Sequence, residues 1–259
     1  MRIRYWSVVA IVMLVVAGTA LAESPWAGKW KMDPSQSKLT GDTIRFTSGG
    51  GDEMTYTGEG HTTKFKLDGT PVKTWSGAEV SWKKIDDNTY ESRAKQNGVE
   101  LGTNTWTLAP DGKALKVESK GTNPDGSSFD NNSNYTRVSG TKGLMGSWKS
   151  TKTDINEEQI YDIAEKGPDE LTWHIPAIKG VVDVPLDGKD SAPVGPTIPK
   201  GLTISLVRTS SHTLKMVEKI NGEPIYRSTM TLSADGKKFT DVGTPAKTNE
   251  PMTTVWIKQ

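Results

Sequence analysis

The side chains that most often perform catalysis or bind metals are few and scattered in this chain of 259 residues. The three histidines, His61, His174 and His212, are far apart in sequence, and no His-x-x-x-His pair is present. There is no cysteine to act as a nucleophile or as a thiolate ligand. Because a zinc site needs several such ligands at short spacing, we predict no metal site and no thiol chemistry.

Carboxylates occur in two groups whose spacing would let one acid donate a proton while another acts as a base or nucleophile. These are Asp86, Asp87 and Glu91, and the pair Glu157 and Glu158. Both groups stand beside turn residues, so we interpret them as solvated surface charges. Ser127 and Ser128 lie in a turn-rich segment, and the glycine run at 49–51 lacks the lysine of a phosphate loop. The sequence therefore predicts no catalytic residue, no cofactor and no enzyme activity.

Turn signals and alternating hydrophobicity define the elements that carry these residues. Asp-Gly or Asn-Gly occurs seven times, and each pair favours the left-handed conformations of tight hairpins. Between the turns, apolar and polar residues alternate, as in Phe65 and Leu67, which predicts strands with one buried face. The segment 156–167 has a spacing that would also suit a short helix. Its counterpart earlier in the chain alternates at Ile44 and Phe46, so we predict a strand in both places.

The chain carries one pattern twice. "WAGKWK" at 26–31 returns as "LMGSWK" at 144–149, and "EMTY" at 53–56 returns as "ELTW" at 170–173. Farther on, "KQNG" at 95–98 matches "KING" at 219–222, and "WTLAPDGK" at 106–113 matches "MTLSADGK" at 230–237, both at an offset of 124 residues. A repeat this long indicates two domains of one fold. We predict domains at 23–138 and 144–259, joined by a linker at 139–143.

An antiparallel meander avoids exposed sheet edges by closing on itself. We therefore predict an all-β protein of two tandem up-and-down barrels, each with about eight strands.

The repeated Gly-x-Trp at the first strand, with a basic residue in the last strand, resembles the lipocalin or broader calycin pattern. The motif residues are Gly28 and Trp30 in the first copy and Gly146 and Trp148 in the second. The resemblance implies that each tryptophan plugs one end of a barrel, with a cation across its indole. Within each copy this would pair Trp30 with Arg137 and Trp148 with Lys258. Such a contact is worth about 0.5–2 kcal/mol.

The first residues have the pattern of a signal peptide. Arg2 and Arg4 precede an apolar run, and Ala20-Leu21-Ala22 fits a cleavage site. We therefore expect residues 1–22 to be removed and the protein to be exported to the periplasm or the extracellular space, without membrane insertion. Without these two arginines, 30 basic residues face 31 acidic ones with interspersed signs. This balance predicts no nucleic-acid partner, and we expect a monomer of two domains.

Aromatic and apolar residues are the remaining candidates for a function. If the barrels are hollow, the lining in the first copy is predicted to comprise Tyr56, Phe65, Trp82, Tyr90 and Trp106, with Trp75 as a contact at the mouth. In the second copy the predicted lining comprises Trp173, Leu206 and Leu214. Such walls suit a small apolar or amphipathic ligand. If the barrels are filled, we expect a structural or protein-interaction module of the cell envelope.

The two copies differ most in one loop. The second copy has five extra residues after "LDG", and this segment carries Pro193, Pro196 and Pro199. Prolines at this spacing stiffen a loop and exclude a central strand. The loop at 193–199 is either a lid over a barrel mouth or a plain surface excursion.

Overall fold

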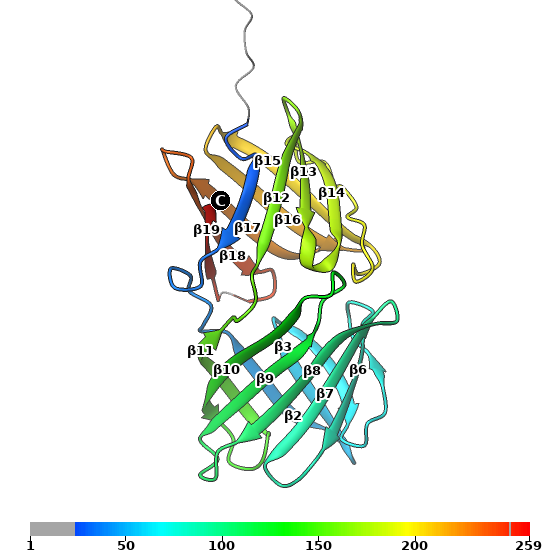
Figure 1. Ribbon diagram of the computed structural model, residues 1–259. Coiled ribbons are helices and arrows are strands. Elements are labelled where there is room, and N and C mark those ends of the chain that lie inside the picture. The colour runs from blue at the N-terminus through cyan, green and yellow to red at the C-terminus, as the bar shows by residue number, and fades with distance from the viewer. Residues whose placement is uncertain (1–23, 249) are drawn as a thin grey trace, which may run out of the picture.

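The computed structural model describes residues 24–248 and 250–259. The predicted signal peptide therefore lies outside the described residues. Antiparallel strands form two nearly closed barrels (Figure 1), as the alternation predicted. The only helix in the described ranges is one 3-10 turn, η1 (Pro176–Ile178), and no helix there is long and apolar enough to cross a membrane. The ambiguous segment at 156–167 forms a strand from Ile160 onward.

The first barrel is a sheet of ten strands in the order β4-β3-β2-β11-β10-β9-β8-β7-β6-β5. Their bounds are β2 (Thr43–Gly50), β3 (Glu53–Gly58), β4 (His61–Lys66), β5 (Val72–Lys73), β6 (Glu79–Lys84), β7 (Thr89–Gln96), β8 (Val99–Leu108), β9 (Ala114–Thr122), β10 (Ser128–Ser139) and β11 (Gly146–Asp154).

The second barrel is a sheet of nine strands in the order β14-β13-β12-β1-β19-β18-β17-β16-β15. Their bounds are β1 (Gly28–Met32), β12 (Ile160–Gly167), β13 (Glu170–Ile175), β14 (Gly180–Pro185), β15 (Leu202–Ser210), β16 (Thr213–Ile220), β17 (Glu223–Leu232), β18 (Lys238–Pro245) and β19 (Met252–Lys258).

The two repeats exchange their first strands. Strand β1, blue in Figure 1, lies in the second barrel between β12 and β19, where Trp30 pairs with Tyr161 and Lys258. Strand β11 lies in the first barrel between β2 and β10, where Trp148 pairs with Ile44 and Arg137. The expected division into 23–138 and 144–259 therefore separates the sequence repeats but not the barrels, each of which contains a strand from both repeats.

The exchange corrects the expected tryptophan–cation pairs. The Arg137 guanidinium lies 4.0 Å from the ring centroid of Trp148, and Lys258 Nζ lies 5.2 Å from that of Trp30. The physical reason is the equivalence of the two first strands. In both, the indole Nε1 donates a 2.9 Å hydrogen bond to the carbonyl four residues earlier, so either strand suits either barrel and sequence cannot tell which it joins.

Gly-x-Trp has a steric basis at both barrel ends. Gly28 and Gly146 adopt φ values of +133° and +129°, a region that favours glycine. A Cβ at Gly28 would lie 2.5 Å from Lys258 Cε. The glycine therefore lets the basic side chain approach the first strand beside the tryptophan.

The two barrels meet end to end at the middle of the molecule (Figure 1). The segment 33–42 leads from β1 in one barrel to β2 in the other, and 155–159 leads from β11 to β12. Contacts cross this joint: the Glu250 carboxylate accepts hydrogen bonds from Thr43 N at 3.0 Å and from Thr43 Oγ1 at 2.7 Å. The backbone N–H of Asp125 also donates to the carbonyl of Ala177 at 3.2 Å.

Candidate functional site

The interior of the first barrel is filled by aromatic side chains. Trp82 stacks on Phe65 at a centroid separation of 4.7 Å and lies 4.9 Å from Trp106. Phe46 and Tyr56 pack against the same group at centroid separations of 5.7 to 6.5 Å. Such tilted and stacked pairs are favourable contacts. Four of the residues predicted to line a cavity here thus form a packed core instead, because their rings occupy the space between the strands.

The other two residues predicted to contact a ligand in the first barrel are Trp75, expected at the mouth, and Tyr90. Trp75 is 40% exposed and stacks on His61 at 3.7 Å, outside the buried cluster. Burial, followed by the charge of Lys247, lowers the pKa of His61. A Cβ at the adjacent Gly60 would overlap the Cβ of Lys247, which places this pair beside the second barrel. Tyr90 belongs to the buried cluster, but a Cβ on Gly143 would approach its hydroxyl at 3.4 Å, which places it toward the tryptophan-plugged end.

The second barrel, in contrast, contains an interior cavity of about 60 Å³. Its walls are mainly apolar and aromatic side chains, with two carboxylates among them. The lining residues are Tyr161, Trp173, Ile175, Val182, Val184, Ile204, Leu206, Met216, Glu218, Met230 and Asp241.

Substitutions between the repeats account for the cavity. In the first barrel Trp82 pairs with Ser92, and Trp106 pairs with Val117. In the second barrel Leu206 pairs with Met216, and Met230 pairs with Asp241, at the same register and at the offset of 124 residues.

The two tryptophans of the filled barrel are thus replaced by Leu206 and Met230 in the other. The same comparison replaces Phe46 and Phe65 by Ile163 and Val184. Fewer rings leave space between the strands of the second barrel.

The same comparison introduces the carboxylates. Glu218 stands where the first barrel has Ala94, and Asp241 stands where it has Val117, as the pairings with Ile204 and Met230 establish. Both acids therefore occupy inward-facing places that are apolar in the first barrel. Burying a charge without a partner is costly. Packing alone would therefore not favour acids in place of apolar residues at two positions of one cavity.

The electrostatics of the cavity favour the neutral acids. Burial, with the charges of Asp241 and Glu59, raises the pKa of Glu218 to about 7, and burial raises the pKa of Asp241. Burial also raises the pKa of Tyr161, reinforced by both carboxylates. The charges acting on Glu218 are thus negative, and within the described ranges neither acid forms an ion pair with lysine or arginine.

Two polar atoms at the cavity are buried without a hydrogen-bond partner in the described part of the chain. They are the indole Nε1 of Trp173 and the Oδ1 of Asp241; the buried hydroxyl of Ser228, close enough to Asp241 to lower its pKa, is also without a partner there. The Trp173 side chain is 8% exposed. Because buried polar groups are nearly always paired, this donor and this acceptor are places where a water molecule or a ligand group can bind.

The β3–β4 hairpin of the first barrel lies against the second barrel. Glu59 lies at the tip of the β3–β4 hairpin with a φ of +51°, and its charge contributes to the raised pKa of Glu218. At the neighbouring Gly60, a Cβ would overlap the Cβ of Lys247. A second cavity of about 190 Å³ lies at this joint, with acidic lining from Asp42, Glu59 and Glu250.

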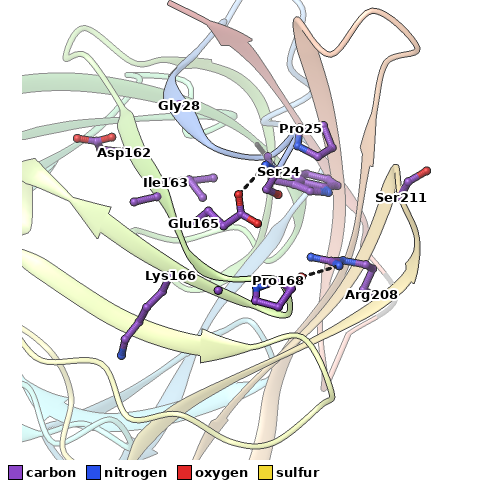
Figure 2. A pocket seen from close by; sticks show the side chains of 13 residues that line it. Ser24, Pro25, Gly28, Asp162, Ile163, Glu165, Lys166, Pro168, Arg208 and Ser211 are labelled. Atoms are coloured by element: carbon purple, nitrogen blue, oxygen red, sulfur yellow. Dashed lines mark hydrogen bonds between the residues drawn. The ribbon is translucent and has the colours of Figure 1, made fainter. Parts of the chain in front are cut away.

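A larger, open cleft of about 960 Å³ lies at the other end of the second barrel (Figure 2). The Glu165 carboxylate accepts a hydrogen bond from Ser24 N at 2.8 Å, and Arg208 donates to the carbonyl of Pro168 at 3.0 Å. Figure 2 shows these polar groups already engaged with one another. The cleft is broad and open, so its shape selects a ligand less sharply than the enclosed cavity does.

The proline loop touches the first barrel. The Asn97 side-chain amide donates hydrogen bonds to the carbonyls of Ile198 at 2.8 Å and Pro196 at 3.3 Å. Within its own barrel, Val194 exchanges backbone hydrogen bonds with Val181 at 2.8 and 2.9 Å. The loop at 193–199 therefore lies across the joint between the barrels, close to β14, whose Val182 lines the cavity.

Of the residues predicted for the second barrel, Trp173 and Leu206 line the cavity, and Leu214 is fully buried beside it. Sequence reasoning missed Glu218 and Asp241. The signal was present, because Glu218 alternates with Leu214, Met216 and Ile220 on one face of a strand. An acid at that inward place is an exception to the alternation of the barrel.

No protein-family model, no curated protein and no solved structure matches this chain. In residues 24–248 and 250–259, no three histidine, aspartate or glutamate side chains are grouped so that they could hold a metal ion.

Proposed function

We propose that this is an exported, non-enzymatic binding protein of lipocalin-like type that holds a small amphipathic ligand in its second barrel. The carrying observation is the small interior cavity with apolar walls and two partly buried carboxylates. Binding sites for small molecules have this composition: mostly apolar walls with a few polar groups that fix orientation.

The lipocalin-like assignment is supported by the two Gly-x-Trp strands and by the basic residue over each indole. In this proposal the two barrels have different tasks. The second barrel binds, and the first barrel covers its mouth through the Glu59–Gly60 hairpin tip.

The filled first barrel favours a second candidate function. Its interior is packed with aromatic rings, which supports a structural or protein-interaction module for that half of the molecule. The two functions are compatible, because a filled barrel is a rigid support for a neighbour that binds.

Methionine methyl groups provide a test of ligand binding. Met216 and Met230 line the cavity, whereas Met54 packs against the core of the first barrel. We expect isobutanol, a small neutral amphipathic probe, to shift the ¹³C-methyl signals of Met216 and Met230 and to leave that of Met54 unchanged. Native mass spectrometry of gently purified protein should also show a small bound mass.

The matched control is Met230→Trp, which introduces the residue that the first barrel has at this place. This variant should fill the cavity and abolish the response of Met216 to isobutanol. Equal shifts at Met54, or the absence of any shift in the wild-type protein, would contradict the proposal.

A further inference from the structure

We propose that the ligand of the second barrel is a small organic cation, an ammonium group on a short apolar body, whose charge lies between Glu218 and Asp241. This inference rests on the proposed function and narrows it to one class of ligand. It follows from the charge, the walls and the size of the cavity together.

The positive charge of the ligand is inferred from the comparison of the two barrels. Ala94 and Val117 show that this fold needs no acid at either place, yet the second barrel has Glu218 and Asp241 there. Two carboxylates that share an enclosed space repel each other, and burial disfavours their ionised forms. A cation between them would remove both penalties, and its N–H groups would donate to the open Asp241 Oδ1.

The walls favour an organic cation over a metal ion. Metal ions such as Ca²⁺ take six or more oxygen ligands, whereas this cavity offers two carboxylates among aliphatic and aromatic side chains. Tyr161 and Trp173 pack at a centroid separation of 5.1 Å on one side. Aromatic faces attract ammonium groups, most strongly where water is excluded. The open indole Nε1 of Trp173 remains as a donor to a hydroxyl or carbonyl oxygen on the ligand.

The volume of the cavity limits the number of heavy atoms in the ligand. A volume of about 60 Å³ is well below the roughly 300–1,000 Å³ of sites for drug-sized molecules. A ligand that enters without movement of the walls has only a few heavy atoms. This excludes long acyl chains and fits a short branched or linear amine.

Three probes of nearly equal size separate charge from shape: isobutylammonium, isobutanol and isobutyrate. Binding is measured at pH 8 by titration calorimetry and by the indole N–H signal of Trp173. We expect isobutylammonium to bind about ten to a hundred times more tightly than isobutanol, as charged hydrogen bonds of this kind allow. Isobutyrate should be rejected.

Two variants assign the preference to the carboxylates. In Glu218→Gln and Asp241→Asn, the advantage of isobutylammonium over isobutanol should shrink to about threefold or less while isobutanol still binds. Asp162→Asn, an exposed carboxylate next to Tyr161 on strand β12, should leave the advantage unchanged.

The outcomes distinguish the two levels of the proposal. If isobutanol or isobutyrate binds as tightly as isobutylammonium, the cation inference is wrong and the binding function stands. If none of the three probes binds, both are wrong. If Asp162→Asn removes the preference as fully as Glu218→Gln does, the charge acts from outside the cavity and the assignment of the site is overturned.

Discussion

Replacing Glu218 by glutamine should make the protein more stable at alkaline pH. Burial and the charges of Asp241 and Glu59 raise the pKa of Glu218 from its ordinary value of 4.5 to about 7 in the folded protein. The folded state therefore holds this proton more tightly than the unfolded state does. Its contribution to stability is complete below about pH 4.5 and is lost as the pH rises through 7.

The magnitude follows from the separation of the two pKa values. Each pH unit between them corresponds to about 1.4 kcal/mol, so ionised Glu218 lowers the free energy of unfolding by about 3 kcal/mol at pH 8 relative to acidic pH. Most of this loss occurs between pH 5 and pH 8. Glutamine does not titrate, so Glu218→Gln should lack this part of the pH dependence. Asp241, Glu59, Tyr161 and Tyr226 remain in both proteins and titrate in both.

Urea denaturation at pH 5, 6, 7 and 8 gives the free energies of unfolding. Between pH 5 and pH 8 the wild-type protein should lose about 2–3 kcal/mol more than Glu218→Gln does. Glu223→Gln, an exposed acid on the adjacent strand β17, is the control and should follow the wild type. Parallel pH profiles of wild type and Glu218→Gln would refute the assignment of a buried, unpaired carboxylate.

Further predictions concern the strand exchange and the joint between the barrels. Trp30→Ala should cost about 3–5 kcal/mol as a large core truncation, and hydrogen exchange should accelerate in β12 and β19 of the second barrel; acceleration confined to β2 and β10 would show that β1 is not exchanged. Trp148→Ala should accelerate exchange in β2 and β10 instead, with β12 and β19 little changed. A double-mutant cycle of Thr43→Val with Glu250→Gln should give a coupling free energy of about 1–3 kcal/mol for the hydrogen bond from Thr43 Oγ1 across the joint, since valine keeps the backbone N–H; additive effects would mean that this hydroxyl and the carboxylate do not interact.

The fold class was predictable because it depends on local signals. Asp-Gly and Asn-Gly turns and alternating residues such as Phe65 and Leu67 act within a few positions, so they predict hairpins and a meander. The exchange of β1 and β11 was not predictable. Trp30 and Trp148 make the same local hydrogen bond, and no local property of either strand selects its barrel. That choice depends on the connections at 33–42 and 155–159, which act over long distances.

The site was predictable only in part, because composition alone does not distinguish a filled barrel from a hollow one. Trp82 and Trp106 looked like cavity walls, but large rings on facing strands fill the space that they would line. Trp173 and Leu206 line the cavity because their neighbours Met230 and Val184 are smaller than the corresponding Trp106 and Phe65. Glu218 and Asp241 are recognisable as inward-facing acids only from the strand register, which places them where the first barrel has Ala94 and Val117.

The most direct test of ligand binding inside the second barrel is a set of intermolecular nuclear Overhauser effects with isobutylammonium at pH 8. We expect contacts from the methyl groups of the probe to the methyl groups of Met216 and Met230 and to the indole of Trp173. Contacts confined to Ser24, Pro25 and Arg208 at the open cleft, or to Met252 at the joint, would contradict an interior site.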